Sequence, residues 1–164
     1  MSGRILLSSS ESREYITGWK QGCIETVIDC EGSLSLIRYK RPYKNDYDYQ
    51  PLLSITNTSE VYLDMINNLT RNLGHINIQK HGDEKNKACF RLTFSGDALR
   101  DILPNIGLII KEQQRLLLLD ALDVLDTMKE KRGRCIFALT PKAREILDEI
   151  WLEMRKLNKR GDTR

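Results

Sequence analysis

The sequence predicts an α+β fold in which two antiparallel β-hairpins alternate with helices and further helices follow. Three observations support this fold class. Apolar residues alternate with polar ones in two pairs of short segments, as half-buried strands require. Around these segments apolar residues recur at helical spacing, and Gly, Pro, Asn and Asp gather where the period changes. The chain of 164 residues, with 40% hydrophobic and 30% charged residues, fits one folded domain of ordinary size.

A helix with a row of small residues opens the fold. The serine-rich N-terminus is expected to be flexible, and a helix capped near Ser12 is expected to run to about Ile28. Within it Gly18, Gly22 and Thr26 recur every four residues. A glycine costs about 1 kcal/mol in a helix interior relative to alanine. The row therefore indicates a place where a second backbone approaches closely; the alternative is an exposed helix of poor propensity.

The first hairpin follows this helix. Leu34 and Leu36 alternate with serines, which predicts a half-buried strand. The stretch RPYKNDYDYQP is rich in Tyr, Asn, Asp and Pro, and it predicts a long basic hairpin loop. Leu53 and Ile55 then mark the buried face of the second strand.

A helix and a second hairpin repeat this arrangement. The stretch NTSEVYLDMINNLTRNLG is amphipathic at helical spacing, with Thr58 or Ser59 as its N-cap and Gly74 at its end. Alternation on both sides of the turn GDEKNK predicts two more strands. Their inward residues are expected to be Ile76, Ile78, Phe90, Leu92 and Phe94.

Three helices complete the predicted fold. They are expected at residues 97–106, 111–131 and 141–158. Thr140 and Pro141 suit the N-cap and the first position of the last helix. The chain is then divided into a flexible N-terminus at 1–12, a core at 13–132 and a C-terminal helical extension at 133–164.

The face of the strands opposite the apolar one carries polar and basic side chains and few acids. Such side chains hydrogen-bond base edges and phosphates, although an antiparallel sheet also leaves one face in water for solubility alone. The net charge of +3 is too small to decide between the two. The concentration of acids on the helices favours DNA contact by the strands. The candidate DNA-binding residues are Ser33, Ser35, Arg38, Tyr39, Lys40, Arg41, Gln50, Ser54, Thr56, Asn77, Gln79, His81, Lys87 and Arg91.

The cysteines and the hydropathy pattern argue against several classes of protein. The four cysteines follow no metal-ligand or disulfide spacing, so free thiols are expected. No apolar run approaches the ~20 residues of a membrane span, and the N-terminus lacks the apolar core of a secretory signal. The expected location is the cytoplasm, with no membrane partner.

The stretch IETVIDCEG, Ile24 to Gly32, resembles the LAGLIDADG motif, with IDCEG where IDADG is usual. The order of helices and hairpins over roughly residues 13 to 125 is similar to the αββαββα core of the LAGLIDADG homing endonucleases. Only one copy of the motif is present, and one-motif members of that family are homodimers. The resemblance implies a homodimeric, intron-encoded endonuclease that makes a double-strand break in a long pseudo-palindromic DNA target. It further implies a saddle-shaped sheet on the DNA, a location in cytoplasm, organelle or nucleus with the host intron, and a dimer interface that includes Gly18, Gly22 and Thr26.

The resemblance also implies roles for individual residues. Glu31, the last acid of the motif, stands where the family has its metal-binding acid, and Cys30 stands where a backbone carbonyl joins it. Asn57, at the end of the second strand, matches the polar residue that orders the attacking water. Lys111 matches a lysine that assists at the scissile phosphate. The implied cofactor is Mg²⁺, which prefers oxygen ligands.

Other positions depart from the family pattern. The basic helix residue that relatives use would fall near Val61, so its role is absent or moves to Arg71 or Arg115. Glu25 stands within the motif, and it must point away from the helix–helix seam or find a partner. Asp29 is expected to be structural and to hold the turn at the helix end.

Other functions are compatible with the same residues. A maturase that helps an intron RNA to fold, or a DNA-binding protein that does not cut, would use this fold without needing the acid at Glu31. An unrelated α+β interaction module in which IDCEG occurs by chance is the third hypothesis. The joint presence of Glu31, Asn57 and Lys111 favours cleavage.

Overall fold

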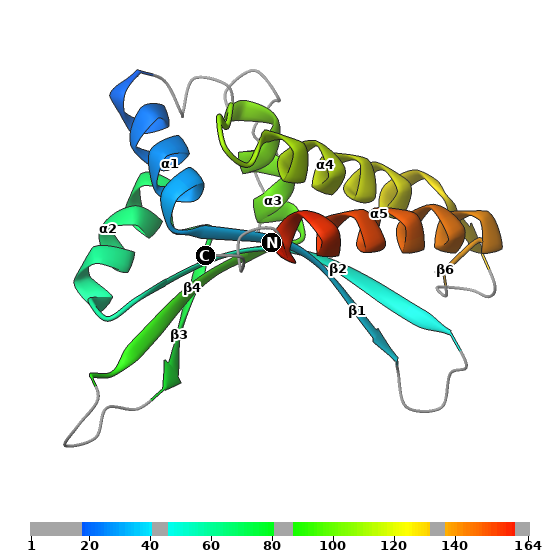
Figure 1. Cartoon of the computed structure of the whole chain (residues 1–164), viewed down its shortest axis with the longest axis horizontal. Helices are drawn as coiled ribbons and strands as arrows, with labels where there is room; N and C mark the ends of the chain where they lie inside the picture. Colours follow the sequence, from blue (N-terminus) through cyan, green and yellow to red (C-terminus); the bar gives the residue numbers. More distant parts are fainter. Residues whose placement is uncertain (1–17, 41–45, 81–86, 132–136, 160–164) are drawn as a thin grey trace, which may run out of the picture.

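The computed structural model describes residues 18–40, 46–80, 87–131 and 137–159, and it confirms the α+β prediction. Its centre is a four-stranded antiparallel sheet with strand order β1-β2-β4-β3. The helices lie together on one side of this sheet (Figure 1). The strands of the sheet are β1 (Gly32–Lys40), β2 (Tyr47–Asn57), β3 (His75–Lys80) and β4 (Cys89–Ser95). The helices are α1 (Trp19–Cys30), α2 (Glu60–Leu69), α3 (Asp97–Ile102), the 3₁₀ turn η1 (Leu103–Asn105), α4 (Glu112–Thr127) and α5 (Pro141–Lys159).

The sheet divides into two arms that diverge in Figure 1. β2 pairs with β1 from Tyr47 to Ile55, but it pairs with β4 only from Leu52 to Asn57. Pro51 is the residue just before the shared segment, and it lacks the N–H group that a second neighbour would need. β2 is also longer than predicted. It starts at Tyr47, inside the stretch expected to form the hairpin loop, because residues 47–51 pair with β1.

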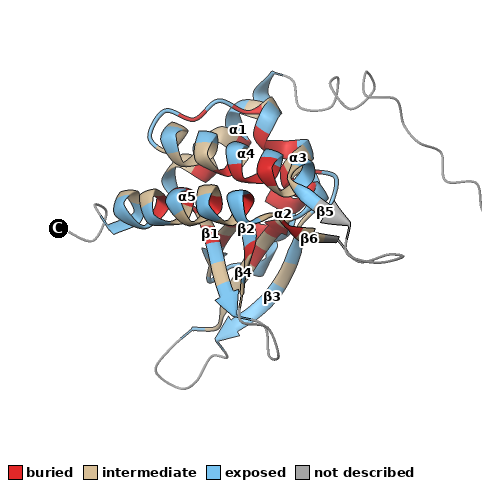
Figure 2. Cartoon of the chain, turned by 90° about the vertical axis from the view of Figure 1, so that its right-hand side faces the viewer, coloured by how far each residue is buried: buried red, intermediate tan, exposed pale blue. Residues whose placement is uncertain are grey.

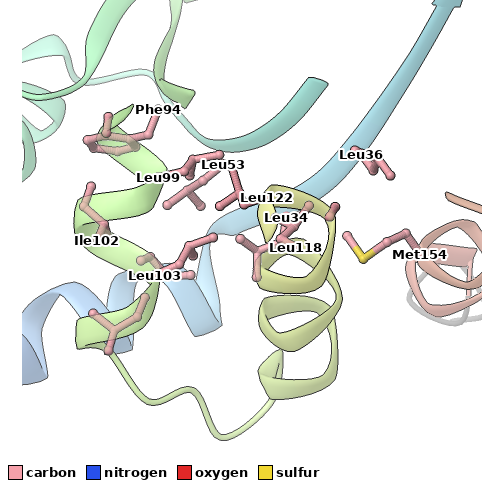
Figure 3. Packing of buried hydrophobic residues seen from close by; sticks show 14 of the residues in the cluster. Leu34, Leu36, Leu53, Phe94, Leu99, Ile102, Leu103, Leu118, Leu122 and Met154 are labelled. Carbon is pink, nitrogen blue, oxygen red and sulfur yellow. The ribbon is translucent and has the colours of Figure 1, made fainter. Parts of the chain in front are cut away.

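The core is one continuous apolar cluster between the sheet and the helices. Leu34, Leu53 and Phe94 from the strands pack against Leu99 and Leu118 from α3 and α4 (Figure 3). Full burial of a side chain of this size contributes roughly 1.5–3 kcal/mol. Buried residues gather in the helices and the centre of the sheet, whereas the arms are more exposed (Figure 2). The sheet thus has one covered face and one open face.

The C-terminal region differs from the predicted long helix. α4 ends at Thr127, and two short antiparallel strands follow, β5 (Lys129–Lys131) and β6 (Phe137–Leu139). This hairpin crosses the predicted boundary between core and extension. α5 then adds Leu147 and Met154 to the same core cluster. Its predicted start is confirmed, because the Ala143 N–H donates to Thr140 Oγ1 at 3.1 Å. No helix in the described ranges combines the length and apolarity needed to cross a membrane.

The ends of α1 and α2 also differ from the prediction. Gly18 has φ +65° and lies before the first turn of α1, so it is not inside the helix. Ser59 caps α2, as expected, by accepting the Tyr62 N–H at 3.2 Å. α2 ends at Leu69 rather than at Gly74. The Asn67 side chain instead binds the backbone of Gly74. Its Oδ1 accepts the Gly74 N–H at 2.8 Å, and its Nδ2 donates to the Gly74 carbonyl at 3.2 Å.

The edge strand β3 does not follow the predicted alternation to its end. Ile76 is half-buried, but Ile78 is 53% exposed and so does not reach the core. The register shifts between Ile78 and Lys80, where Gln79 is the additional residue. The bulge follows Ile78, which pairs with Phe90 and shares the side of β3 with Ile76. Its predicted direction is therefore confirmed, and only its predicted burial was wrong.

Candidate functional site

Glu31 lies at the junction of α1 and β1 with its side chain exposed. Its N–H donates to the Val27 carbonyl at 2.8 Å and closes the last turn of α1. Gly32 follows, and a Cβ there would lie 2.7 Å from the Ile28 carbonyl oxygen. Only glycine permits this close passage from helix to strand. The backbone is therefore held on both sides of the acid, while its carboxylate lies exposed at the surface of the protomer.

Asn57, to which the resemblance assigns the ordering of a water molecule, meets Glu31 although 26 residues separate them. The Asn57 Nδ2 lies 3.4 Å from Glu31 Oε2, a long hydrogen bond. The Asn57 Oδ1 accepts the Ser59 N–H at 2.9 Å, which turns the amide so that its NH₂ group faces the acid. This NH₂ group can donate a second hydrogen bond, so it can orient a water molecule beside the carboxylate.

Tyr62 is a third side chain at this site, and the sequence reasoning missed it. It lies in the first turn of α2, and its hydroxyl hydrogen-bonds the Glu31 carboxylate. Burial raises the pKa of Tyr62, and the charge and hydrogen bond of Glu31 raise it further. No local pattern in the sequence marks it, because its place at the site depends on how α2 packs beside α1.

Lys111 reaches the same end of α1 from the start of α4. Its Nζ donates to the Ile28 carbonyl at 2.8 Å and also to the Asp29 carbonyl. These carbonyls form the negative end of the α1 dipole, which stabilises a cation. Burial lowers the pKa of Lys111, and the nearby Asp29 charge opposes this effect. The predicted lysine therefore stands at the helix end that also carries Glu31.

The other acids of the motif have structural partners. The Asp29 carboxylate accepts the N–H groups of Ile109 at 2.7 Å, Ile110 at 3.2 Å and Lys111 at 3.0 Å. Asp29 is structural, as predicted, but it holds the segment before α4 rather than a turn of its own helix. Glu25 has the expected partner, because its Oε1 accepts the Gly107 N–H at 2.8 Å.

The two alternative basic residues are differently placed. Arg115 donates to both carboxylate oxygens of Glu112 and to the Leu103 carbonyl at 2.8 Å. Its guanidinium therefore hydrogen-bonds groups of its own chain at the start of α4 and in η1. Arg71 lies just beyond the end of α2 with φ 58° and is exposed.

The donor chemistry fits a hard divalent cation, but one protomer is incomplete as a metal site. Glu31 supplies one exposed carboxylate, and oxygen donors of this kind suit Mg²⁺. Among the residues that the structure describes, no group of three His, Cys, Asp or Glu side chains is placed to hold a metal ion. A site at Glu31 therefore needs ligands from outside the protomer.

The open face of the sheet, here called the outer face, is mainly polar. The register aligns Ser33, Ser54, Thr93 and His75 in one row across all four strands. A second row joins Thr56, Arg91 and Asn77. The sequence reasoning missed His75, although its alternation with Ile76 marked it. The outer face consists of Ser33, Ser35, Ile37, Tyr39, Asp48, Gln50, Leu52, Ser54, Thr56, His75, Asn77, Cys89, Arg91, Thr93 and Ser95.

Several predicted DNA-binding residues lie elsewhere. Arg38 is on the helix side of β1, in alternation with Leu34 and Leu36, and it pairs with Asp148 of α5. The prediction followed its charge and overlooked the alternation. Lys40 shares that side of β1 but is exposed at the strand end. The remaining candidates off the outer rows are Gln79 at the bulge and Lys87 before β4, while Arg41 and His81 lie outside the described residues.

One face of α1 is exposed and built from small or apolar residues. Trp19 is 70% exposed, and Gly22 and Thr26 are exposed on the following turns. The Thr26 hydroxyl donates to the Gly22 carbonyl at 2.7 Å, so its hydrogen-bonding need is met within the helix. A Cβ on Gly22 would meet nothing within 4 Å in the protomer. The fold of one protomer therefore gives no reason for a glycine at this position.

Comparison with solved structures shows that this fold is that of the LAGLIDADG homing endonucleases. The archaeal intron-encoded homing endonuclease I-Vdi141I, complexed with DNA, matches at TM-score 0.65 and 19% identity over 85% of this chain and 84% of that chain. I-SmaMI, bound to an uncleaved DNA target in the presence of calcium ions, matches at TM-score 0.64 and 21% identity over 85% of this chain. The LAGLIDADG homing endonuclease I-GzeII, in complex with its DNA target, matches at TM-score 0.55 and 17% identity over 80% of this chain. No family model and no curated protein matches the sequence.

The lengths of these structures differ. The chain spans 46% of I-SmaMI and 42% of I-GzeII, but 84% of I-Vdi141I. It therefore corresponds to about half of the two longer proteins.

Proposed function

We propose that two copies of this chain form a site-specific DNA endonuclease of the homing type, which makes a double-strand break by metal-dependent hydrolysis. The observation that carries the proposal is the meeting of Glu31, Asn57 and Lys111 at one end of α1. The fold shared with DNA-bound homing endonucleases supports it. A protein that only binds DNA has no need of an exposed carboxylate there, because a carboxylate repels phosphate.

A second copy completes the site. One protomer offers a single free carboxylate at the end of α1, whereas hydrolysis of two strands needs two such centres. The exposed α1 face with Gly22 and Thr26 allows two α1 helices to pack closely. This packing brings the two copies of Glu31 together. The match to about half of I-SmaMI supports the two-copy arrangement.

Each residue then has a distinct role. Glu31 and a backbone carbonyl at Cys30 would hold Mg²⁺, which would neutralise phosphate charge and activate a water molecule for attack. The Asn57 NH₂ group, fixed by Ser59, orients a water beside the carboxylate. Lys111 supplies positive charge toward the phosphate from its position on the α1 carbonyls. Tyr62 holds the Glu31 carboxylate in place through its hydroxyl.

The outer face is proposed to read the DNA. Two-stranded β-ribbons fit the major groove, and each protomer carries two such arms. The polar rows at Ser54 and Arg91 offer hydroxyl, guanidinium and amide groups toward bases and phosphates. Two protomers related by a two-fold axis read a pseudo-palindrome with roughly 10 bp in each half.

The test is cleavage of a duplex library with Mg²⁺, followed by sequencing of the ends and by variants on the recovered target. Glu31→Gln keeps the size of the side chain but removes its charge. We expect it to bind the target and to cleave at least on the order of 1,000-fold more slowly, which corresponds to about 4 kcal/mol of transition-state stabilisation. Glu145→Gln, an exposed acid on α5, is the control with the same change in net charge. Equal cleavage rates of the two variants would show that Glu31 is not part of a catalytic site.

The same experiment separates the alternative functions. A protein that shifts duplex DNA in a gel but never cuts it is a DNA-binding protein of this fold. Preference for a structured intron RNA over duplex DNA would favour the maturase hypothesis.

A further inference from the structure

The outer half of the β1–β2 arm has less support from the sheet than the inner half. Beyond Leu52 toward the tip, β2 pairs with β1 alone, because β4 ends at Ser95 opposite Leu52. An isolated two-stranded hairpin is only marginally stable in water. Yet Tyr49, which lies in this outer half, is only 7% exposed. Something other than the sheet therefore covers the arm.

The cover is α5, which lies on the same side of the β1–β2 arm as the other helices (Figure 1). Two ion pairs join them. Arg38 Nη1 of β1 lies 3.0 Å from Asp148 Oδ1 of α5. Arg144 Nη1 of α5 lies 2.9 Å from Asp46 Oδ2, just before β2. Both arginine side chains are 24% exposed, whereas the Asp148 and Asp46 side chains are 39% and 46% exposed, so the guanidinium halves of the pairs are shielded more than the carboxylate halves.

Aromatic contacts reinforce the ion pairs. The Arg38 guanidinium lies 3.8 Å from the centre of the Tyr47 ring and 4.9 Å from the Trp151 ring of α5. A planar guanidinium can stack on aromatic faces while it pairs with a carboxylate, which a lysine cannot do equally well. Asp148 also hydrogen-bonds Tyr49, and burial together with this bond raises the pKa of Tyr49. Asp148 thus contacts both strands of the arm.

The other face of this same segment belongs to the outer face. Tyr39 and Gln50 alternate with Arg38 and Tyr49, so they point away from α5. Under the proposed function they face DNA. The position of these reading side chains therefore depends on contacts made on the reverse side of the strands.

We propose that α5 is a brace that sets the position of the β1–β2 arm, and that Asp148, Trp151 and Arg38 are positioning residues for sequence discrimination that do not touch DNA. This inference rests on the proposed function, since it assigns a role within the reading of the target. The C-terminal helix then keeps a two-stranded arm in one position, so that a wrong base pair cannot be accommodated by movement of the arm.

The test compares Asp148→Asn with Glu145→Gln, which removes the same charge from an exposed position of the same helix. Binding and cleavage are measured on targets in which each base pair is replaced in turn. A mismatched pair ordinarily costs about 5- to 150-fold in binding. In Asp148→Asn we expect this discrimination to fall toward 1-fold at the outer positions read by the arm. The preferred target should lose less than about threefold, and central positions should keep their discrimination.

Amide hydrogen exchange gives a readout that does not depend on DNA. Asp148→Asn should accelerate exchange in the outer parts of β1 and β2 at 37–40 and 47–50, and leave 52–57 unchanged. Arg38→Lys keeps the charge but removes the planar stacking, so an intermediate acceleration is expected. Unchanged exchange in both variants would show that there is no brace. Faster exchange with an unchanged discrimination profile would refute the role in specificity. If the wild type reads no DNA, the exchange result still decides whether α5 supports the arm.

Discussion

Replacement of Asp29 tests how the motif helix is attached to the rest of the fold. Its carboxylate accepts three backbone N–H groups from Ile109, Ile110 and Lys111, at 2.7, 3.2 and 3.0 Å. Asp29→Ala removes all three bonds. Each contributes about 1 kcal/mol net, and the carboxylate also lies at the N-terminal end of α4, where negative charge is favourable. Water can replace part of the loss, because two of the bonds are exposed.

We therefore expect Asp29→Ala to lower the free energy of unfolding by about 2–3 kcal/mol, or the melting temperature by roughly 5–10 °C for a chain of this size. Asp29→Asn keeps one carbonyl acceptor and should lose about half as much. The assay is denaturant and thermal unfolding followed by circular dichroism at fixed protein concentration, because the proposed dimerisation would make stability depend on concentration.

The control is Asp120→Ala, an exposed acid on α4 for which the structure shows no hydrogen bond to the segment before that helix. It should change the unfolding free energy by less than about 0.5 kcal/mol. If Asp29→Ala is as stable as this control, the three hydrogen bonds do not hold the segment before α4. Asp29 would then have no structural role at this position.

Three further changes test other parts of the fold. Gly22→Leu should convert the proposed dimer to a monomer in sedimentation while the protomer stays folded, because a Cβ at this position meets nothing within 4 Å of its own chain; a persistent dimer would place the interface elsewhere. Gly74→Ala should destabilise the fold by about 1–3 kcal/mol in urea titrations, since its Cβ would lie 2.5 Å from Leu92 Cδ1, and a neutral result would mean that the turn relaxes. The Arg100 hydrogen bond at 2.7 Å lowers the pKa of Asp126, so its stabilisation is complete above the ordinary Asp pKa of about 3.9 and is lost as the pH falls through the lowered pKa. Arg100→Gln should therefore be less stable at pH 7 and should lose less stability between pH 4 and pH 2 than the wild type, and parallel pH curves would contradict this linkage.

The strands and their inward faces could be predicted from the sequence because short-range alternation determines them. Leu34, Leu53 and Leu92 all lie on the covered face, as their alternation indicated. The same rule, if applied to charged residues, would have placed Arg38 on that face too. Its assignment to DNA followed from composition, which carries no information about direction. The wrong assignment of Arg38 thus came from weighing its charge above its position in the alternation of the strand.

Other features depend on contacts between distant residues and left no local pattern. The bulge at Gln79 arises from how β3 meets β4, and the segment itself reads as a regular strand. The hairpin after α4 lies in three-residue strands, too short for alternation to identify. Tyr62 joins the Glu31 site only because α2 packs beside α1, and a single tyrosine in an amphipathic helix is ordinarily a core residue.

The resemblance at IDCEG led to the site more effectively than residue chemistry alone. An exposed acid such as Glu31 has no local feature that separates it from Asp29 two positions earlier. Their difference appears only in three dimensions, where one carboxylate binds backbone amides and the other remains open.

Pro51 has a consequence for how such a protein can change over time. It stands where β2 loses its second neighbour, so the two arms share only the short ladder from Leu52 to Asn57. Substitutions at separate, non-contacting sites have nearly additive effects. Substitutions in one arm should therefore leave the structure of the other arm nearly unchanged. Under the proposed function, single substitutions in one arm can then change the preferred DNA sequence without compensating changes in the other arm.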